Sequence, residues 1–372
     1  MSVTSGVDTD EGRVSKAPEK SPSEPRRNAS LRKGEGRRAI FLILPTLVLL
    51  AVVIGYPVVK AIIMSFQKDP GLDKSTGLFV SGGNAGFSNY THWLLQRCGE
   101  ASCPPGTLGS QFWDSVTTTF FFTAVTVVVE VCLGMWMAIV MNRAFRGRGL
   151  LRASVLVPWA IPTAVTAKLW FFIFAYDGIA NHLLGTHILW TGDEWASRFA
   201  VIIADVWKTT PFIALLILAG LQVIPGDIYE AARVDGASAW QRFTRVTLPL
   251  VRPALMVAVL FRVLDVLRIY DLPAILTNGG GGSGHATTTL SILVINQIRQ
   301  GFNSASALST IVFLIIAFTA FLFIKFGGAD VVQRPPRGPS GKKKKRRKSQ
   351  GDALDGDSNI EGSVIGSIGT GR

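Results

Sequence analysis

Charged residues are scarce in this 372-residue chain, where Asp, Glu, Lys and Arg together make up 17%. A typical soluble domain has roughly 25%. The apolar residues, 48% of the chain, gather in runs longer than the roughly 18 residues that mark a membrane span. The shortage of charge and this clustering argue against a soluble domain and predict an all-α polytopic membrane protein.

Cysteine and histidine are also few, which excludes a disulfide-rich scaffold. The four His are scattered and no zinc spacing is present, so we expect no metal site. Cys132 lies inside an apolar segment, where we expect it in the core. Cys98 and Cys103 lie in the polar loop RCGEASCPP. They form a short-loop disulfide if this loop faces an oxidising exterior, and otherwise stay free thiols.

Motifs for nucleotide binding and for covalent catalysis are missing. The tail segment GPSGKKKK at 338–345 lacks the Ser or Thr of a phosphate-binding loop, and NGGGGSGH at 278–285 lacks its Lys. No G-x-S-x-G motif or nucleophile–base arrangement is apparent. We therefore expect neither an enzyme nor a cofactor on this chain.

Long apolar segments predict six transmembrane helices. The fifth is interrupted by Arg262, Asp265, Arg268 and Asp271. The predicted spans are residues 39–65, 115–141, 153–176, 199–223, 253–277 and 305–326.

The net charge of +13 is concentrated in the two ends of the chain, residues 1–38 and 327–372, whose composition predicts disordered tails. The run KKKKRRK at 342–348 resembles a nucleic-acid patch, but no aromatic residue is interleaved with it for base stacking. We expect no nucleic-acid partner. The basic tails instead favour contact with anionic lipid of the cytoplasmic leaflet.

The Lys and Arg residues of the connections predict the orientation. The loops 142–152 and 224–252 hold four each, whereas 177–198 and 278–304 hold one each. By the positive-inside rule the two basic loops and both termini are cytoplasmic. The prediction is a multi-pass protein of the plasma (inner) membrane.

The basic loop 224–252 contains a polar, helix-forming insert, EAARVDGASAWQRFTRVTLPL at 230–250. Asp227 with Glu230 has the spacing of a capping box, which predicts a helix over 228–234. Gly236 then ends this helix, because glycine accepts the left-handed geometry of a helix C-terminus.

A second short helix is predicted after Ser238, which can cap it. The small side chains of Ala231, Ala232 and Ala237 allow another surface to approach closely. From physics alone, an interfacial amphipathic helix and a docking segment for a partner both remain open.

The insert resembles the EAA motif of the membrane subunits of bacterial ABC importers. The match includes Leu248-Pro249, and Val246 stands where the family often has Ile. In that family the motif forms a coupling helix, here 228–237, that docks on the ATP-hydrolysing subunit. The residues at motif positions are Glu230, Ala231, Ala232, Asp235, Gly236 and Ala237.

This resemblance covers about residues 39–326 and implies the fold of type I ABC importer permeases. It also implies a complex with a second homologous permease, two ABC ATPase subunits and an extracytoplasmic sugar-binding lipoprotein. ATP and Mg²⁺ would be bound by the partner ATPases, outside this chain.

Further segments suggest a sugar as substrate. GFSNYTHWL at 86–94 looks like the maltose-type permeases, and VWKTTPF at 206–212 and LFRVLDVLRIYD at 260–271 look closer to actinobacterial trehalose importer permeases. The resemblance implies a disaccharide such as trehalose. Maltose or maltodextrin, a glycerol-phosphate-type solute, a polyamine or an anion are alternatives, as is a non-transport membrane scaffold recruited by the basic tails.

Ionisable residues inside the predicted spans are costly in hydrocarbon, by about 2.5 to 3.5 kcal/mol each, and should face the bundle interior or a wet cavity. Two interpretations stay open, internal ion pairs that fix packing or a polar substrate path. In the fourth and fifth spans these charges accompany hydroxyl and aromatic side chains, a mixture that suits a polyol. The predicted path residues are Trp207, Lys208, Thr209, Arg262, Asp265 and Tyr270, with Asn296 and Gln297 at the exterior mouth.

Overall fold

The computed structural model describes residues 29–72, 78–80, 82–99, 101–282 and 284–326. Most of the two predicted tails therefore lies outside the described residues. Within the N-terminal tail, however, the backbone is already helical from Ala29, in contrast to the predicted disorder of 1–38. The segment before the first span, ASLRKGEGRR, is helical despite Gly34 and Gly36, and it continues the helix of that span.

The described chain is almost entirely helical. Its helices are α1 (Ala29–Leu50), η1 (Ala51–Gly55), α2 (Tyr56–Ser65), α3 (Ser88–Leu94), η2 (Leu108–Gln111), α4 (Phe112–Asn142), α5 (Arg148–Ala160), α6 (Thr163–Ile173), α7 (Ile179–Leu184), α8 (Glu194–Gln222), α9 (Gly226–Val234), α10 (Ala239–Arg242), η3 (Phe243–Thr247), α11 (Leu248–Val266), α12 (Asp271–Leu276), α13 (Leu290–Ile298) and α14 (Phe302–Phe326). Two small antiparallel hairpins pair β1 (Gly71–Leu72) with β2 (Phe79–Val80) and β3 (Arg97–Cys98) with β4 (Ala101–Ser102).

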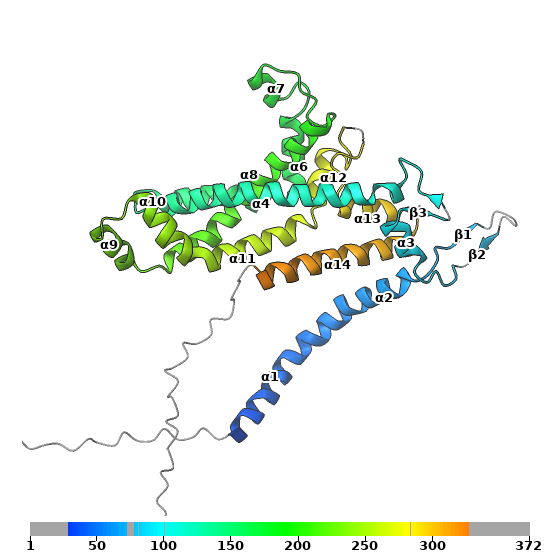
Figure 1. Ribbon diagram of the computed structural model, residues 1–372, viewed down its shortest axis with the longest axis horizontal. Coiled ribbons are helices and arrows are strands. Elements are labelled where there is room, and N and C mark those ends of the chain that lie inside the picture. Colours follow the sequence, from blue (N-terminus) through cyan, green and yellow to red (C-terminus); the bar gives the residue numbers. More distant parts are fainter. Residues whose placement is uncertain (1–28, 73–77, 81, 100, 283, 327–372) are drawn as a thin grey trace, which may run out of the picture. The chain divides into compact units, whose positions relative to one another are not determined.

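The bundle is organised around α4 and α8, which pack along each other over most of their length (Figure 1). Small residues make this close packing possible. A Cβ placed on Gly134 of α4 would lie 2.8 Å from Ile213 Cγ2 of α8, and one on Gly220 would lie 2.4 Å from the Cβ of Ala254 on α11. Packing through small residues is typical of helix–helix contacts in membranes.

Among the described residues, five helices are long and apolar enough to cross a membrane, and a bent helix pair makes a sixth. Five predicted spans therefore correspond to such helices, and the third does so when the bent pair is counted as one span. The first, second, fourth and sixth correspond to helices over Ile40–Ser65, Leu108–Asn142, Glu194–Gln222 and Phe302–Lys325.

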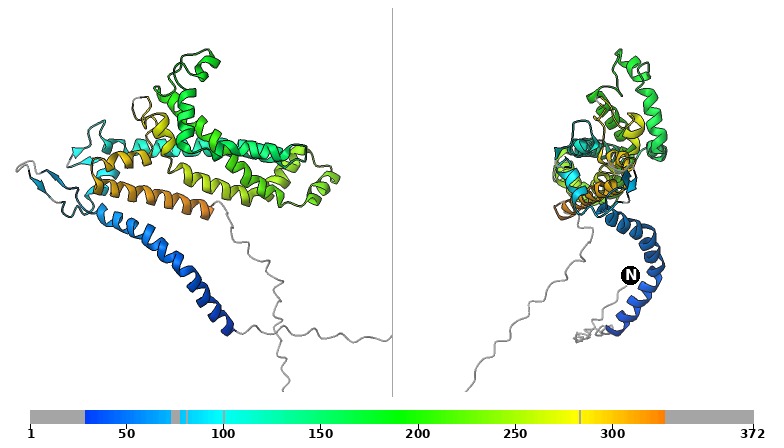
Figure 2. Two further views of the ribbon diagram at one scale, coloured as in Figure 1. Left: turned by 180° about the vertical axis from the view of Figure 1, so that it is seen from behind. Right: turned by 90° about the vertical axis from the view of Figure 1, so that its right-hand side faces the viewer.

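The third predicted span, 153–176, is wrong as a single straight helix. It is the bent pair, α5 and α6, whose axes differ by 90° (Figure 2). Ile161, at the break, is extended with φ −74° and ψ 131°. The cause is Pro162, because a proline disfavours helical geometry in the residue before it and lacks the N–H that would continue the ladder.

The fifth predicted span, 253–277, has the wrong limits. A continuous helix runs over Ala239–Val266, from the insert into the membrane, through α10, η3 and α11. Pro249 is the second residue of α11, directly after the π-helical turn η3, so its missing N–H falls inside the continuous helix. The segment α12 is a separate short helix, and Tyr270 before it is not helical, with φ −134° and ψ −61°.

Contacts of the predicted exterior loops tie the ends of the spans together. Asp69, after α2, accepts backbone hydrogen bonds from Asn303 (2.5 Å) and Ser304 (3.0 Å) in the first turn of α14. A carboxylate at a helix N-terminus satisfies N–H groups that have no partner within the helix. Asp69 therefore fastens the first span to the last.

The three cysteines divide as follows. Cys98 and Cys103 are joined by a disulfide with an S–S distance of 2.10 Å. The cluster of potential metal ligands found in the described part of the chain, His92 with these two residues, thus has both thiols engaged. Cys132 is exposed rather than buried as predicted, because it lies on the face of α4 turned away from the bundle.

Candidate functional site: a coupling helix and a charged intramembrane cavity

The predicted coupling segment forms a helix, a tight turn and a second helix. The first helix, α9, starts at Gly226, and its N-cap is Pro225, so the predicted capping box of Asp227 and Glu230 is wrong. The capping position falls two residues earlier than the sequence pattern indicates. Proline fixes the extended entry into the helix there without a side-chain cap.

The end of α9 is as predicted. Gly236 has φ +75°, and its N–H donates to the carbonyl of Arg233 at 3.0 Å. The N–H of Ala237 donates to the carbonyl of Ala232, also at 3.0 Å, which completes the reversal. Ser238 and Gln241 then form a reciprocal capping box that starts α10, as the sequence predicts for Ser238.

The surface of this insert is open. No residue of α9 is buried, and Val234 and Trp240 are 88% and 71% exposed. A helix of two turns is not stable without packing. These apolar side chains are exposed, as is Glu230, so α9 and the start of α10 present an open face. The continuous helix from Ala239 to Val266 connects that face to the membrane interior.

At the middle of the bundle, Arg262 of α11 lies among three carboxylates. Its guanidinium donates to Glu130 of α4, at 2.6 Å from Nε and 2.9 Å from Nη2, and also to Asp205 of α8 and Asp265 of α11. Thr209 donates its hydroxyl hydrogen to Glu130. The side chains of Arg262, Glu130 and Asp205 are at most 7% exposed, so this network joins three spans through buried charge.

A cavity of about 320 Å³ opens beside this network. Five of the predicted path residues line it, Lys208, Thr209, Arg262, Asp265 and Tyr270. The six remaining lining residues were not in the predicted site. They are Thr163, Asp205, Arg268, Ile269, Asp271 and Leu272. Asp205, Arg268 and Asp271 nevertheless stand out in the sequence as intramembrane charges.

A second cavity, of about 380 Å³, shares four residues with the first, Thr209, Arg262, Asp265 and Arg268. Its remaining wall is apolar and mostly aromatic, made by Trp159, Phe212, Phe261 and Leu264. Trp159 and Phe212 are stacked with ring centroids 5.8 Å apart. The charged wall and the aromatic wall thus meet at Arg262 and its neighbours.

Sequence reasoning missed the aromatic wall. Trp159 lies near the end of α5, which packs against α8, and its ring therefore meets Phe212 of α8. Of the two predicted aromatic path residues, Tyr270 lines the first cavity, whereas Trp207 lines neither cavity and packs edge-on against Trp170 at 5.7 Å. One helical step of about 100° separates its face from that of Lys208.

Asn296 and Gln297 also line neither cavity. Both belong to α13, and Gln297 is buried, with its backbone carbonyl accepting from the N–H groups of Gln300 and Gly301 at 2.9 Å. The structure does not bring these two residues together with the rest of the predicted path.

Comparison with known proteins gives one consistent assignment. A profile of the family described as "Binding-protein-dependent transport system inner membrane component" matches residues 130–333. The trehalose/maltose transport system permease protein MalF of Thermococcus litoralis is 38% identical over 305 residues, covering 80% of this chain and 96% of that protein. The trehalose transport system permease protein SugA of Mycobacterium tuberculosis is 37% identical, covering 82% and 94%.

A solved structure of a bacterial ABC transporter involved in the import of the polysaccharide alginate has a matching chain. The TM-score is 0.61 at 20% identity, with 80% of this chain and 99% of that chain covered. This similarity shows the fold, that of the type I ABC importer permeases. A multi-pass inner-membrane protein is what the spans and the relatives both indicate.

Proposed function

The chain belongs to the family of binding-protein-dependent transport system inner membrane components, and on that premise we propose that it is the permease subunit of an ATP-driven importer for a disaccharide such as trehalose. As a member of this family it is a transport subunit and not an enzyme. Beyond family membership, we propose the substrate class, the route through the membrane and the partners.

The observation that carries the proposal is the pair of adjoining cavities at Arg262. A sugar offers hydroxyl groups to charged and polar partners and C–H faces to aromatic rings. The charged wall, with Lys208, Asp265 and Arg268, suits the hydroxyls, and the wall of Trp159 and Phe212 suits the ring faces. Binding sites that combine apolar walls with a few convergent polar groups are typical of small-molecule recognition.

Relatives support the same substrate class. Trehalose appears in the names of the permeases from Thermococcus litoralis and Mycobacterium tuberculosis. A permease of Agrobacterium fabrum, 34% identical to this chain, is named for sulfoquinovosyl glycerol. Maltose is the alternative, because the name of the relative from Thermococcus litoralis includes maltose as well as trehalose.

We further propose a complex of this chain with a second homologous permease, two ABC ATPase subunits and an external sugar-binding lipoprotein. Closure of the ATPase pair would pull on the exposed face of α9. Because Ala239–Val266 is one continuous helix, this pull would reach Arg262 and reorganise the walls of the cavities. ATP and Mg²⁺ would be held by the ATPase subunits, while this chain would form half of the gate and path.

A direct test uses the purified complex in nanodiscs with its binding protein. We expect trehalose-loaded binding protein to stimulate ATP hydrolysis and unlabelled trehalose to compete with labelled sugar for uptake. Stimulation by a polyamine or an anion, with none by trehalose or maltose, would refute the proposed substrate class.

A further inference from the structure

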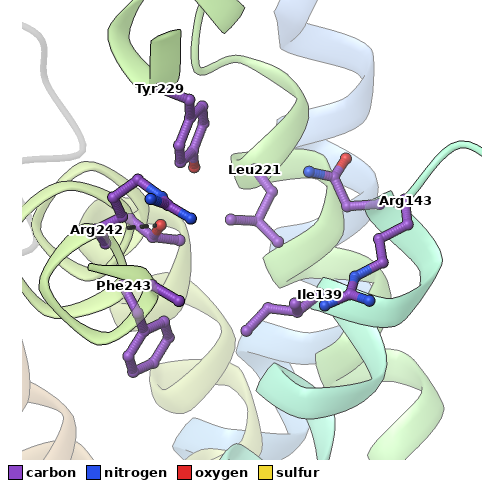
Figure 3. A pocket seen from close by; sticks show the side chains of 9 residues that line it. Ile139, Arg143, Leu221, Tyr229, Arg242 and Phe243 are labelled. Atoms are coloured by element: carbon purple, nitrogen blue, oxygen red, sulfur yellow. Dashed lines mark hydrogen bonds between the residues drawn. The ribbon is translucent and has the colours of Figure 1, made fainter. Parts of the chain in front are cut away.

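A third cavity, of about 430 Å³, lies beneath the coupling segment and separate from the proposed sugar path. Side chains from four parts of the chain converge on it (Figure 3). They come from the end of α4, the end of α8, the coupling helix α9 and the start of the α10–α11 helix. The lining residues are Ile139, Asn142, Arg143, Leu221, Tyr229, Ala239, Arg242, Phe243 and Thr247.

The charges that line this cavity are all positive. Arg143 and Arg242 enter it from opposite sides, and no Asp or Glu is among its lining residues. Arg143 follows the last turn of α4 with an exposed side chain, to which no described residue offers a carboxylate within ion-pair distance. Tyr229 adds a phenolic hydroxyl that points into the cavity.

The floor of the cavity is apolar, made by Ile139, Leu221 and Phe243. Two guanidinium groups above such a floor are a strong arrangement for a phosphate, because Arg presents paired N–H donors that match phosphate oxygens. The floor shields one side of the site from water and salt, which preserves the attraction. The basic loop 142–152 places the site on the cytoplasmic side by the positive-inside rule.

We propose that this cavity binds a phosphate group presented from the cytoplasm, carried by a phosphorylated metabolite or by an anionic lipid, and that its occupation restrains the coupling segment. Arg242 also donates to the carbonyl of Ala237, at 2.6 Å, in the turn that follows α9. A phosphate held between Arg143 and Arg242 would therefore tie this turn to the end of α4. The consequence is a slower conformational cycle when the phosphate is bound.

The test uses the whole complex in nanodiscs of phosphatidylcholine, with glucose 6-phosphate as the soluble probe. We expect glucose 6-phosphate to lower the rate of ATP hydrolysis stimulated by sugar-loaded binding protein. In Arg143→Gln the half-inhibitory concentration should rise about tenfold, the loss expected for one charge-assisted contact. The matched control Arg146→Gln, an exposed arginine of the same loop outside the cavity, should respond as wild type.

The lipid source is tested in the same variants by replacing part of the phosphatidylcholine with phosphatidylglycerol. A rate that depends on phosphatidylglycerol in wild type and Arg146→Gln, but not in Arg143→Gln, assigns the phosphate to lipid. No dependence on either probe, or equal responses of Arg143→Gln and Arg146→Gln, would overturn the proposal.

A second variant, Asn142→Glu, keeps the proposal testable if the Arg143→Gln complex assembles poorly. Asn142→Glu places a carboxylate at an exposed lining position and must also weaken inhibition, so an unchanged response contradicts the proposal. Binding is measured in parallel from the thermal shift of the complex with glucose 6-phosphate. This readout keeps the anion site testable even if no sugar stimulates ATP hydrolysis, a result that would refute only the proposed transport function.

Discussion

Arg262 connects the packing of the bundle with the chemistry of the proposed path. Its guanidinium pairs with Glu130 and Asp205 on two other helices, and the same residue borders both cavities. The two interpretations of the intramembrane charges are therefore compatible at this residue. It joins α4, α8 and α11, and it also forms part of the wall of both cavities.

The first prediction concerns this network. Arg262→Met leaves two buried carboxylates uncompensated and should destabilise the chain by about 3–5 kcal/mol. The midpoint of thermal aggregation of the detergent-solubilised complex measures this loss. Arg268→Met is the control, because the exposed Arg268 side chain donates to the carbonyl of Leu264 at 3.3 Å.

If the loss comes from uncompensated charge, neutralising the partners should restore most of the stability. The triple variant Arg262→Met, Glu130→Gln, Asp205→Asn should therefore aggregate at a higher temperature than Arg262→Met alone. An Arg262→Met protein as stable as Arg268→Met would contradict the structural role assigned to the network.

The second prediction concerns the aromatic wall. Trp159→Ala removes a ring that we assign to the sugar, a contact of about 0.5–1.5 kcal/mol, so the rate of trehalose uptake should fall roughly two- to tenfold. Trp136→Ala is the control, because Trp136 is 65% exposed on α4 and lines neither cavity. Equal rates in the two variants would remove Trp159 from the path.

At the scale of elements, the turn after α9 determines how the coupling segment is presented. Gly236 sits at φ +75°, a geometry that costs other residues about 1–2 kcal/mol and that proline cannot adopt. Gly236→Pro should leave the chain in the membrane but uncouple ATP hydrolysis from uptake. Glu230→Lys should do the same by reversing the charge on the exposed face of α9.

Simultaneous measurement of ATP hydrolysis and sugar uptake in proteoliposomes checks this third prediction. Gly149→Ala is the control, since nothing lies within 4 Å of a Cβ at that position and its φ is not positive. Normal coupled uptake in Gly236→Pro would mean that α9 is not the coupling helix.

The fourth prediction concerns the fastening of α14. Asp69→Ala leaves two backbone N–H groups of the first turn without their acceptor and should lower stability by about 0.5–2 kcal/mol, the usual value of a helix cap. Asp177→Ala, at an exposed position of a different loop, should have little effect on the same aggregation midpoint. A similar loss in both would argue against a specific cap.

Particular elements show what the sequence could and could not predict. The coupling segment was predictable because its helix, its Gly236 turn and the Ser238 cap are local features with sequence signatures. The bend between α5 and α6 was missed, although Pro158 and Pro162 are both visible, because apolar composition continues across it. Hydropathy alone does not report the direction of a helix.

The pairing of Arg262 with Glu130 and Asp205 was beyond the sequence for a different reason. The cost of isolated charge in a membrane predicts that such residues find partners, but not which ones. These partners are separated by 132 and 57 positions, and they meet only after three helices adopt one rotation and register. The same limitation explains why the predicted path includes Trp207 and omits Trp159.

For the whole molecule, the proposed transport cycle depends on one continuous helix, Ala239–Val266. Its cytoplasmic end carries the exposed Trp240 and borders the proposed phosphate site through Phe243, and its membrane part carries Arg262. A pull on the coupling segment would therefore be transmitted to the cavities along this helix, which includes the π-helical turn η3 and Pro253. This connection is the structural basis for assigning the chain a gate as well as part of a path.

The central claim is that this gate admits a disaccharide, and uptake of radiolabelled trehalose and maltose by cells with and without the gene tests it most directly. We predict that deletion abolishes trehalose uptake and that the wild-type gene restores it. If the deletion strain loses maltose uptake but keeps trehalose uptake, the chain is still part of a sugar importer, and its substrate is maltose. Undiminished uptake of both sugars in the deletion strain would contradict the claim.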